Sequence, residues 1–235
     1  MIKLYSKLGG EKMHDFTKLE ESIGYKFTNI LLLNKALTHR SYAYENKIES
    51  NEKLEFLGDA ILEVTISKYM YNHYKKLTEG EMTKVRATVV CEQSLYEVAK
   101  KHNFSDFLNL GKSEIANHGK ERPAILADSV EAIIAAIYLD SNMGNAEKFI
   151  ITNLKDSVEI ASKNVGMKDY KTVLQEKLQT NGSVHIEYVT IDEKGPDHDK
   201  IFTVELKVNG KVKTYGTGRS KKEAEMQAAK KALGM

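Results

Sequence analysis

Two segments of the chain place acidic side chains among apolar residues at helical spacing. Residues 125–137 are apolar on nearly every side, and their only charged residues are Asp128 and Glu131, one turn apart. In residues 51–63, a helix of about 3.6 residues per turn puts four carboxylates within an arc of about 80°, those of Glu52, Glu55, Asp59 and Glu63. Carboxylates in an apolar interior are costly unless they are paired or bind a cation. The two segments therefore predict one shared acidic site.

Such a site points to metal-dependent hydrolysis. The alternative without a catalytic role is that the acids form solvated faces of surface helices. That alternative fits poorly, because a helix that is apolar nearly all round is normally buried, and Lys53 is the only basic residue in either segment. Oxygen ligands without a Cys or His cluster favour Mg²⁺, with Mn²⁺ as a substitute, over zinc. Divalent ions activate water and stabilise the leaving oxygen in phosphodiester hydrolysis.

The elements that must position these acids are mostly helices. Between Phe16 and about Val158, apolar residues recur at helical spacing and strand-like alternation is scarce. The spacing predicts helices at 19–27, 30–38, 54–71, 82–101 and 124–139. Gly, Asn and Ser cluster at the expected breaks, which are 45–51, 111–123 and 141–145.

After Gly166 the pattern changes. A short helix at 170–178 is followed by strand-like alternation at 184–188 and 202–208. Asn209-Gly210 is a strong hairpin signal, and a returning strand follows at 212–216. Ser220 can then cap a last helix that runs through Leu233. This order is helix, three antiparallel strands, helix.

The length of 235 residues allows two domains. We expect an all-α domain at 16–145, a terminal helix and linker at 146–167, and an α+β domain at 168–235. The last of these carries 13 of the 35 Lys and Arg and 10 of the 33 Asp and Glu, which leaves 22 against 23 for the remainder. The asymmetry is modest, so only a local concentration of charge would matter for nucleic acid.

Compartment and redox state follow from what the sequence lacks. No run approaches eighteen apolar residues, and the first ten residues lack the apolar core of a signal peptide. The single cysteine, Cys91, suits a reducing compartment. We therefore expect a cytoplasmic protein. Apolar neighbours predict that Cys91 is a buried, inert thiol.

Residues 51–63 resemble the signature of the ribonuclease III family, with Lys53 where Arg is usual. The likeness continues through Ala-Leu-Thr-His-Arg-Ser-Tyr at 36–42, Glu79-Gly80, 86–90 and 125–128. With the C-terminal region, it covers nearly the whole chain from Phe16. The resemblance implies an all-α ribonuclease III endonuclease domain followed by an α+β (α-β-β-β-α) double-stranded RNA-binding domain.

The resemblance also implies an activity. Family members are magnesium-dependent homodimers that cut double-stranded RNA, leaving 5′-phosphates, 3′-hydroxyls and short 3′ overhangs. They process ribosomal RNA precursors and other structured transcripts. No organic cofactor and no membrane partner is implied.

Individual acids take roles from the resemblance. Asp59 and Glu131 are the indispensable catalytic residues, and the metal-centred set is Glu55, Asp59, Asp128 and Glu131. Glu52 and Glu79 match accessory positions that bind metal-associated water or RNA near the scissile bond. Glu63 continues the acidic stripe, but we assign it a structural role.

Phe56 matches the aromatic residue that projects into the partner subunit of the family's dimer. From the sequence alone, a plain core phenylalanine is an equally good interpretation. Three further residues are expected to act structurally: His39 through packing or a hydrogen bond, Asn51 as a helix cap, and Gly58 by allowing close approach of helices. Lys53 retains the charge of the usual Arg but not its bidentate hydrogen bonding.

The C-terminal region resembles a double-stranded RNA-binding domain through Gly195-Pro-Asp-His198 and Gly216-Thr-Gly-Arg-Ser-Lys-Lys222. Such domains read duplex shape across two minor grooves and the phosphates between them. The implied RNA contacts are Thr172, Gln175 and Glu176 on the first helix, His198 in the loop between the first two strands, and Ser220, Lys221 and Lys222 at the start of the last helix. A Lys pair or a loop His is usually only solvated, but the motifs and the order of elements together favour RNA binding.

Two other functions stay open at this point. One is a double-stranded RNA-binding protein that has lost cleavage, and the presence of all six acidic positions argues against it. The other is a dimeric scaffold without an RNA function, which the C-terminal region disfavours.

Overall fold

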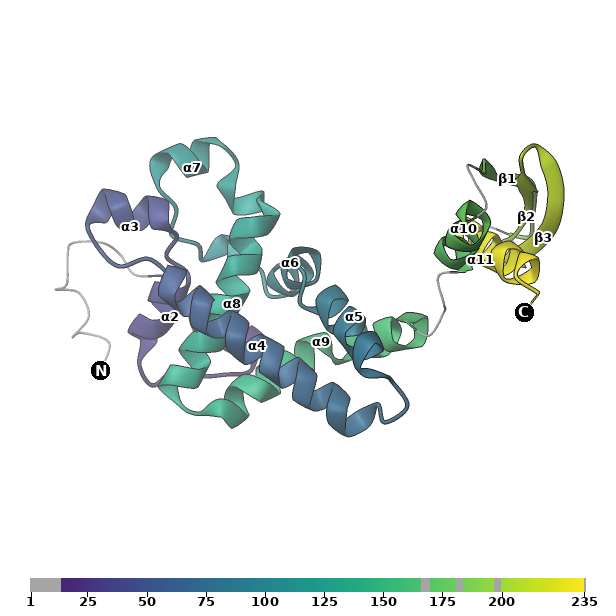
Figure 1. Cartoon of the computed structure of the whole chain (residues 1–235). Coiled ribbons are helices and arrows are strands. Elements are labelled where there is room, and N and C mark those ends of the chain that lie inside the picture. The colour runs from purple at the N-terminus through teal and green to yellow at the C-terminus, as the bar shows by residue number, and fades with distance from the viewer. Residues whose placement is uncertain (1–13, 166–169, 181–183, 197–199, 235) are drawn as a thin grey trace. The chain divides into compact units, whose positions relative to one another are not determined.

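The chain divides into two compact units, residues 1–165 and 166–235 (Figure 1). The computed structural model describes residues 14–165, 170–180, 184–196 and 200–234. In the part of the chain so described, no helix is long and apolar enough to span a membrane.

The described part of the first unit is helical, as predicted. Its helices are α1 (Thr17–Ile23), α2 (Ile30–Ala36), α3 (Arg40–Asn46), α4 (Glu52–His73), α5 (Glu79–Val89), α6 (Glu92–Lys101), α7 (Lys112–Ala116), α8 (Pro123–Asp140) and α9 (Met143–Val165). Short 3-10 turns lie at Phe104–Asp106 and Gly119–Glu121.

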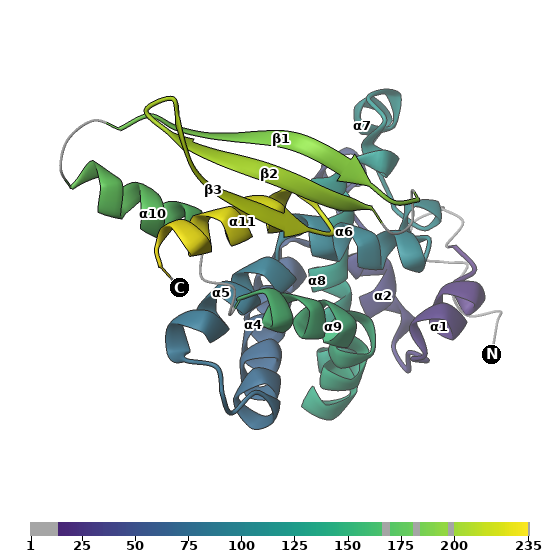
Figure 2. The same cartoon turned by 90° about the vertical axis from the view of Figure 1, so that its right-hand side faces the viewer.

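Helix α8 forms the centre of this unit. Most of its side chains are buried, including Ile133, Ile134 and Ile137. It packs against α2, α4, α6 and α9, and α4 lies beside it in both views (Figures 1 and 2). A helix that is apolar nearly all round is buried here because neighbouring helices cover it on several sides.

The helical region differs from the sequence prediction at several boundaries. The helix expected at 82–101 is two helices, α5 and α6, because Cys91 adopts an extended conformation between them. A capping box of Thr78 and Glu81 starts α5 before the first apolar residue of the pattern. The short helix α3 was not predicted, and α9 extends to Val165, so nearly all of the terminal helix and linker expected at 146–167 is helical.

Cys91 corrects a prediction. Its thiol is exposed rather than buried, because the chain turns there and the buried positions are Val85 and Val89 on α5. Partial burial raises the pKa of the thiol, but hydrogen bonds from Ser94 and nearby amides outweigh this and lower it.

The second unit contains α10 (Tyr170–Gln179), β1 (Ile186–Lys194), β2 (Ile201–Val208), β3 (Lys211–Gly218) and α11 (Lys221–Ala232). The strands form an antiparallel sheet in the order β1-β2-β3, and both helices lie on one face of it (Figure 2). Asn209 and Gly210 join β2 to β3 with φ values of 50° and 75°, as their sequence predicts.

The core of this unit is small and closely packed. Leu174 on α10, Leu206 on β2 and Ala228 on α11 form its centre. Gly216 lets α11 lie directly against β3, because a Cβ there would come within 2.0 Å of the Ala224 carbonyl oxygen. The order helix, three strands, helix is therefore confirmed.

Candidate active site and RNA-binding surface

Helices α4 and α8 approach each other closely at Gly58. A Cβ on Gly58 would lie 1.8 Å from the carbonyl oxygen of Glu131, so only glycine allows this contact. Asp59 and Glu55 flank the contact on α4, and Glu131 and Asp128 lie on the facing part of α8. The close approach expected of Gly58 is confirmed, and it is what brings acids of the two helices together.

The acids interact electrostatically across this contact. Burial, followed by the charges of Asp59, Asp128 and Glu55, raises the pKa of Glu131 to about 8. The pKa of Glu55 is raised first by burial and then by Asp128, Glu52 and Asp59. We call Glu52, Glu55, Asp59, Asp128 and Glu131 the acidic cluster. The four acids that the resemblance assigns to a metal-centred set all belong to it.

The donor set fits a hard divalent cation, because it consists of carboxylates that repel one another. Burial and the charge of Glu92 also raise the pKa of Asp128. Among the residues that the structure describes, however, no three acidic, histidine or cysteine side chains converge closely enough to form a ready-made metal site. The cluster has the chemistry for a cation, and its side chains must draw closer to bind one.

The start of α4 is fastened to the segment before α3. The Asn51 amide donates to the Thr38 carbonyl at 2.9 Å, and Asn51 Nδ2 donates to the Ala36 carbonyl at 3.3 Å. Asn51 therefore does not cap α4 with its side chain, contrary to our expectation. His39 fulfils the structural role expected of it, because its Nδ1 accepts the Ser41 amide at the start of α3.

Sequence reasoning missed two charged neighbours of the cluster. Arg40, on α3, lowers the pKa of both Glu55 and Asp128, and Glu92, on α6, raises that of Asp128. Neither lies in the two acidic segments. For Arg40 a signal was present, because it belongs to the motif at 36–42.

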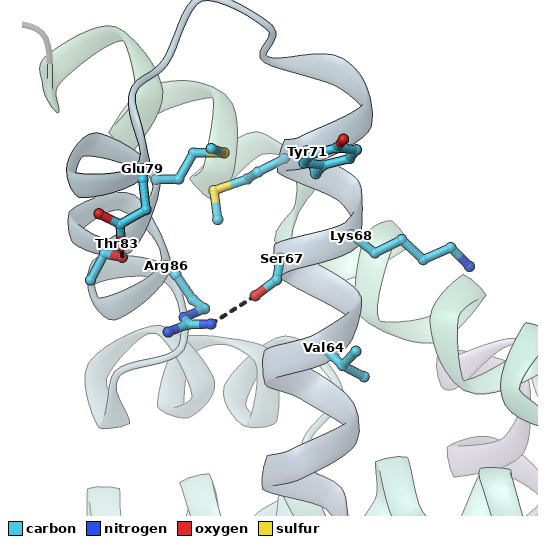
Figure 3. Close-up of a pocket in the computed structure, with 9 residues that line it drawn as sticks. Val64, Ser67, Lys68, Tyr71, Glu79, Thr83 and Arg86 are labelled. Atoms are coloured by element: carbon cyan, nitrogen blue, oxygen red, sulfur yellow. Dashed lines mark hydrogen bonds between the residues drawn. The ribbon is translucent and has the colours of Figure 1, made fainter.

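Glu79 lies apart from the acidic cluster of its own chain. It is the first residue of α5 and lines a cavity of about 550 Å³ between α4 and α5 (Figure 3). Its Oε1 accepts a hydrogen bond from Thr83 at 3.1 Å. Arg86 crosses the same cavity and donates to Ser67 Oγ at 2.9 Å.

Phe56 is not a core residue, because 81% of it is exposed. Val64 and Tyr71, also on α4, are 52% and 69% exposed. With about 100° of rotation per residue, these three lie within about 80° of one another around the helix. We call them the apolar stripe of α4. A solvent-exposed row of large apolar side chains is typical of a protein interface.

The candidate RNA-binding residues lie on two elements of the second unit. Thr172, Gln175 and Glu176 are on the exposed side of α10. Gln175 and Gln179 both line a cavity of about 400 Å³ between α10 and β1.

At the start of α11, Ser220 accepts the Glu223 amide at 3.2 Å and caps the helix as predicted. Lys221 and Lys222 follow and are exposed. Lys221 Nζ lies 3.0 Å from Glu193 Oε1 on β1, so part of its charge is already balanced. His198 lies outside the described residues.

Comparison with known proteins assigns both units. The family model of Ribonuclease-III-like proteins matches residues 29–158, and the double-stranded RNA binding motif matches 170–234. Ribonuclease 3 of Clostridium tetani is 46% identical over 223 residues, which are 94% of this chain and 95% of that protein. The chain belongs to the ribonuclease III family. Ribonuclease 3 of Listeria innocua is a further relative, 44% identical over 94% of this chain and 97% of its own length.

Solved structures agree with this ribonuclease III assignment for the first unit. The nuclease domain of ribonuclease III from Campylobacter jejuni is 38% identical, with a TM-score of 0.58, over 61% of this chain and 98% of that one. The chain thus joins a ribonuclease III nuclease domain to a double-stranded RNA-binding domain, and it is a double-strand-specific endoribonuclease.

Proposed function

We propose that the acidic cluster hydrolyses phosphodiester bonds of double-stranded RNA with Mg²⁺, leaving 5′-phosphate and 3′-hydroxyl ends with short 3′ overhangs. The observation that supports this most directly is the gathering of carboxylates from two helices at the Gly58 contact. Processing of ribosomal, messenger and transfer RNA precursors in the cytoplasm belongs to the same proposal.

Bound divalent ions would supply an activated water and stabilise charge on the leaving oxygen. Glu55, Asp59, Asp128 and Glu131 would hold these ions, and Mn²⁺ has the same preference for oxygen ligands. Glu131 keeps a proton near neutral pH without a cation, since its pKa is about 8. It must lose that proton to become a ligand, so cation binding should strengthen as pH rises toward 8. Glu52 is held at the rim by Ser50 Oγ, which donates to it at 2.8 Å.

Metal dependence gives the direct test. With a long RNA duplex and Mg²⁺, the protein should yield short duplex products, and EDTA should stop cleavage. Mg²⁺ should also raise the Tm of the first unit, because it relieves repulsion among the acids. Gel analysis and a thermal scan measure the two effects, with single-stranded RNA of the same sequence as control. Cleavage that persists without divalent ions would overturn the mechanism, and an intact duplex with Mg²⁺ would favour a binding protein without cleavage.

We propose further that the apolar stripe is covered by a second copy of this chain. In a two-fold dimer, each patch meets the same patch of its partner in reverse order. Along α4, the cavity residues Ser67 and Tyr71 lie about 16 Å and about 22 Å from Phe56. An antiparallel pair of α4 helices can therefore place Phe56 of each protomer in the 550 Å³ cavity of the other. Glu79, on the wall of that cavity, would then approach the partner's acidic cluster.

Phe56→Ala should weaken this dimer. Removing a central aromatic side chain from an interface typically costs about 2–4 kcal/mol, which raises the dissociation constant about 30- to 1000-fold. Sedimentation equilibrium measures the change. Tyr44→Ala is the matched control, because Tyr44 is 88% exposed but lies on α3. Equal dissociation constants for the Phe56 variant and the unmodified protein would refute the assignment of this surface.

The exposed side of α10 and the start of α11 are proposed to bind duplex RNA, together with His198 in the loop between β1 and β2. Lys222→Ala should weaken binding several-fold for every duplex sequence and lower the salt slope of log K by about 1. Lys231→Ala is the control, because Lys231 is an exposed lysine on the same helix about 13 Å further along. Fluorescence anisotropy at several salt concentrations distinguishes them. Identical slopes for the two variants would exclude Lys222 as a phosphate contact.

A further inference from the structure

A single arginine lies at the rim of the acidic cluster. Arg40 is the first residue of α3 and is exposed. It lines an open cavity of about 710 Å³ together with Ser50 and Glu52, at the start of α4. Glu52 itself belongs to the cluster. Arg40 and one member of the acidic cluster, Glu52, therefore line the same open cavity.

The backbone before Arg40 is held firmly in place. Thr38 accepts the Asn51 amide, which fastens it to the start of α4. The amide of His39 donates to the Asn109 carbonyl at 3.1 Å, and Thr38 also forms a bridge with Asn109. These contacts fix where the Arg40 side chain leaves the backbone relative to Glu52 and Glu55.

Arg40 is close to the acids without being neutralised by one of them. Burial chiefly sets the pKa of Glu55 and Asp128 and raises both, and the positive charge of Arg40 lowers both. In the described residues, no carboxylate forms an ion pair or hydrogen bond with its guanidinium. The Glu52 carboxylate accepts from Ser50 instead.

The lysine next to Glu52 in the sequence acts on a different acid. Lys53 lies on α4 beside Glu52. The pKa of Glu49 is lowered chiefly by Lys35, which forms an ion pair with it, and to a smaller extent by the charge of Lys53. It is not among the charges that act on Glu55, Asp128 or Glu131. Of these two exposed cations, only Arg40 is among the charges that lower the pKa of Glu55 and Asp128.

A cation in this position would offset the electrostatic repulsion between the acidic cluster and RNA. RNA carries a negative charge on every phosphate, and the acidic cluster repels it. Cations held by the carboxylates offset part of that repulsion at the cluster itself, but the neighbouring phosphates of the strand also need counter-charge. A guanidinium presents N–H donors in a planar fork that matches two phosphate oxygens, and it stays charged at any working pH.

We propose that Arg40 binds a phosphate of the RNA strand that enters the acidic cluster, adjacent to the bond that is cut, and so positions that strand. This rests on the proposed role of the cluster as the site of cleavage. Arg40 would act on binding and register of the strand, leaving the bond-breaking groups to the cluster.

Binding tests this contact independently of cleavage. Duplex RNA affinity is measured across a salt series with the full chain carrying Glu131→Gln, so that the substrate stays intact. Adding Arg40→Gln should weaken binding about tenfold and lower the salt slope of log K by about 1, whereas Arg40→Lys should retain most of the slope. Lys53→Gln makes the same change of charge nearby and should leave both values unaltered.

Cleavage kinetics complete the test. Without the Glu131 change, Arg40→Gln should raise KM about tenfold and change kcat much less. A series of duplexes, each with one uncharged methylphosphonate at a different position near the cut, locates the contact. Arg40→Gln should no longer weaken binding when the methylphosphonate replaces the phosphate that Arg40 contacts. An unchanged salt slope with an altered Mg²⁺ requirement would overturn the proposal, since Arg40 would then act only on the acids. If the unmodified protein cut no duplex, the proposed role of the cluster would fail, while the binding series would still decide the Arg40 contact.

Discussion

Glu131→Gln should lower kcat for duplex cleavage by about 10³-fold and leave duplex affinity nearly unchanged. The loss corresponds to about 4 kcal/mol of transition-state stabilisation, as expected when one group that holds a catalytic charge is removed. Burial and the charges of three other carboxylates in the acidic cluster raise the pKa of Glu131 to about 8. Single-turnover cleavage with saturating protein measures the effect.

The same substitution should stabilise the metal-free protein at high pH. The unfolded chain releases the Glu131 proton near pH 4.5, whereas the folded chain keeps it up to about pH 8. Between these values the folded state binds more protons, so its stability falls as pH rises. A glutamine at position 131 cannot ionise, so this loss of stability at high pH should not occur in the variant. The Tm of the variant should therefore exceed that of the unmodified protein at pH 8 in EDTA, and the difference should vanish near pH 4.5.

Glu63→Gln is the matched control for both effects. Glu63 lies on the same acidic stripe of α4, yet its charge is not among those that raise the pKa of Glu131. Its substitution should change kcat less than about threefold and leave the pH dependence of Tm as it is. If both variants lost activity equally, the division between the acidic cluster and a merely structural Glu63 would be wrong.

The sequence predicts the acids but only part of their surroundings. Helical periodicity places Glu55 and Asp59 on one side of α4 and Asp128 and Glu131 on one side of α8, because each pair lies within one or two turns. Arg40 and Glu92 reach the site from α3 and α6. Their approach depends on how separate helices pack, and periodicity within one segment contains no information about that.

Local patterns also misjudge single residues at the ends of elements. Cys91 follows two valines, but only Val89 is buried, because the chain turns between α5 and α6. Asn51 has the side chain of a helix cap, yet it donates to Ala36 across the fold. Phe56 lies on the side of α4 opposite buried Leu54 and Gly58, so its exposure depends on what covers that side of the helix. Hydrophobicity alone could not separate the core and interface alternatives.

Gly58→Ala should be among the most damaging single-methyl changes in the chain. The added Cβ would meet the Glu131 carbonyl oxygen at 1.8 Å and its carbonyl carbon at 2.5 Å, and both belong to the backbone of a buried helix. Overpacking of this kind costs about 3 kcal/mol or more, which lowers Tm by roughly 6–12 °C for a unit of this size. The helices can relieve the clash only by separating, and a shift of about 1 Å at a catalytic site can cost about 100-fold in rate.

The control for Gly58 is another glycine on a helix of the same unit. Around Gly80, on α5, there is no atom within 4 Å of an added Cβ among the described residues. Gly80→Ala should therefore raise stability by up to about 1 kcal/mol, because alanine favours the helix. Thermal unfolding and cleavage rates of the two variants compare the same chemical change with and without the α4–α8 contact. If Gly58→Ala proved as harmless as Gly80→Ala, the two helices could not approach as closely as the acidic cluster requires, and the catalytic assignment of Glu55, Asp59, Asp128 and Glu131 would lose its geometric basis.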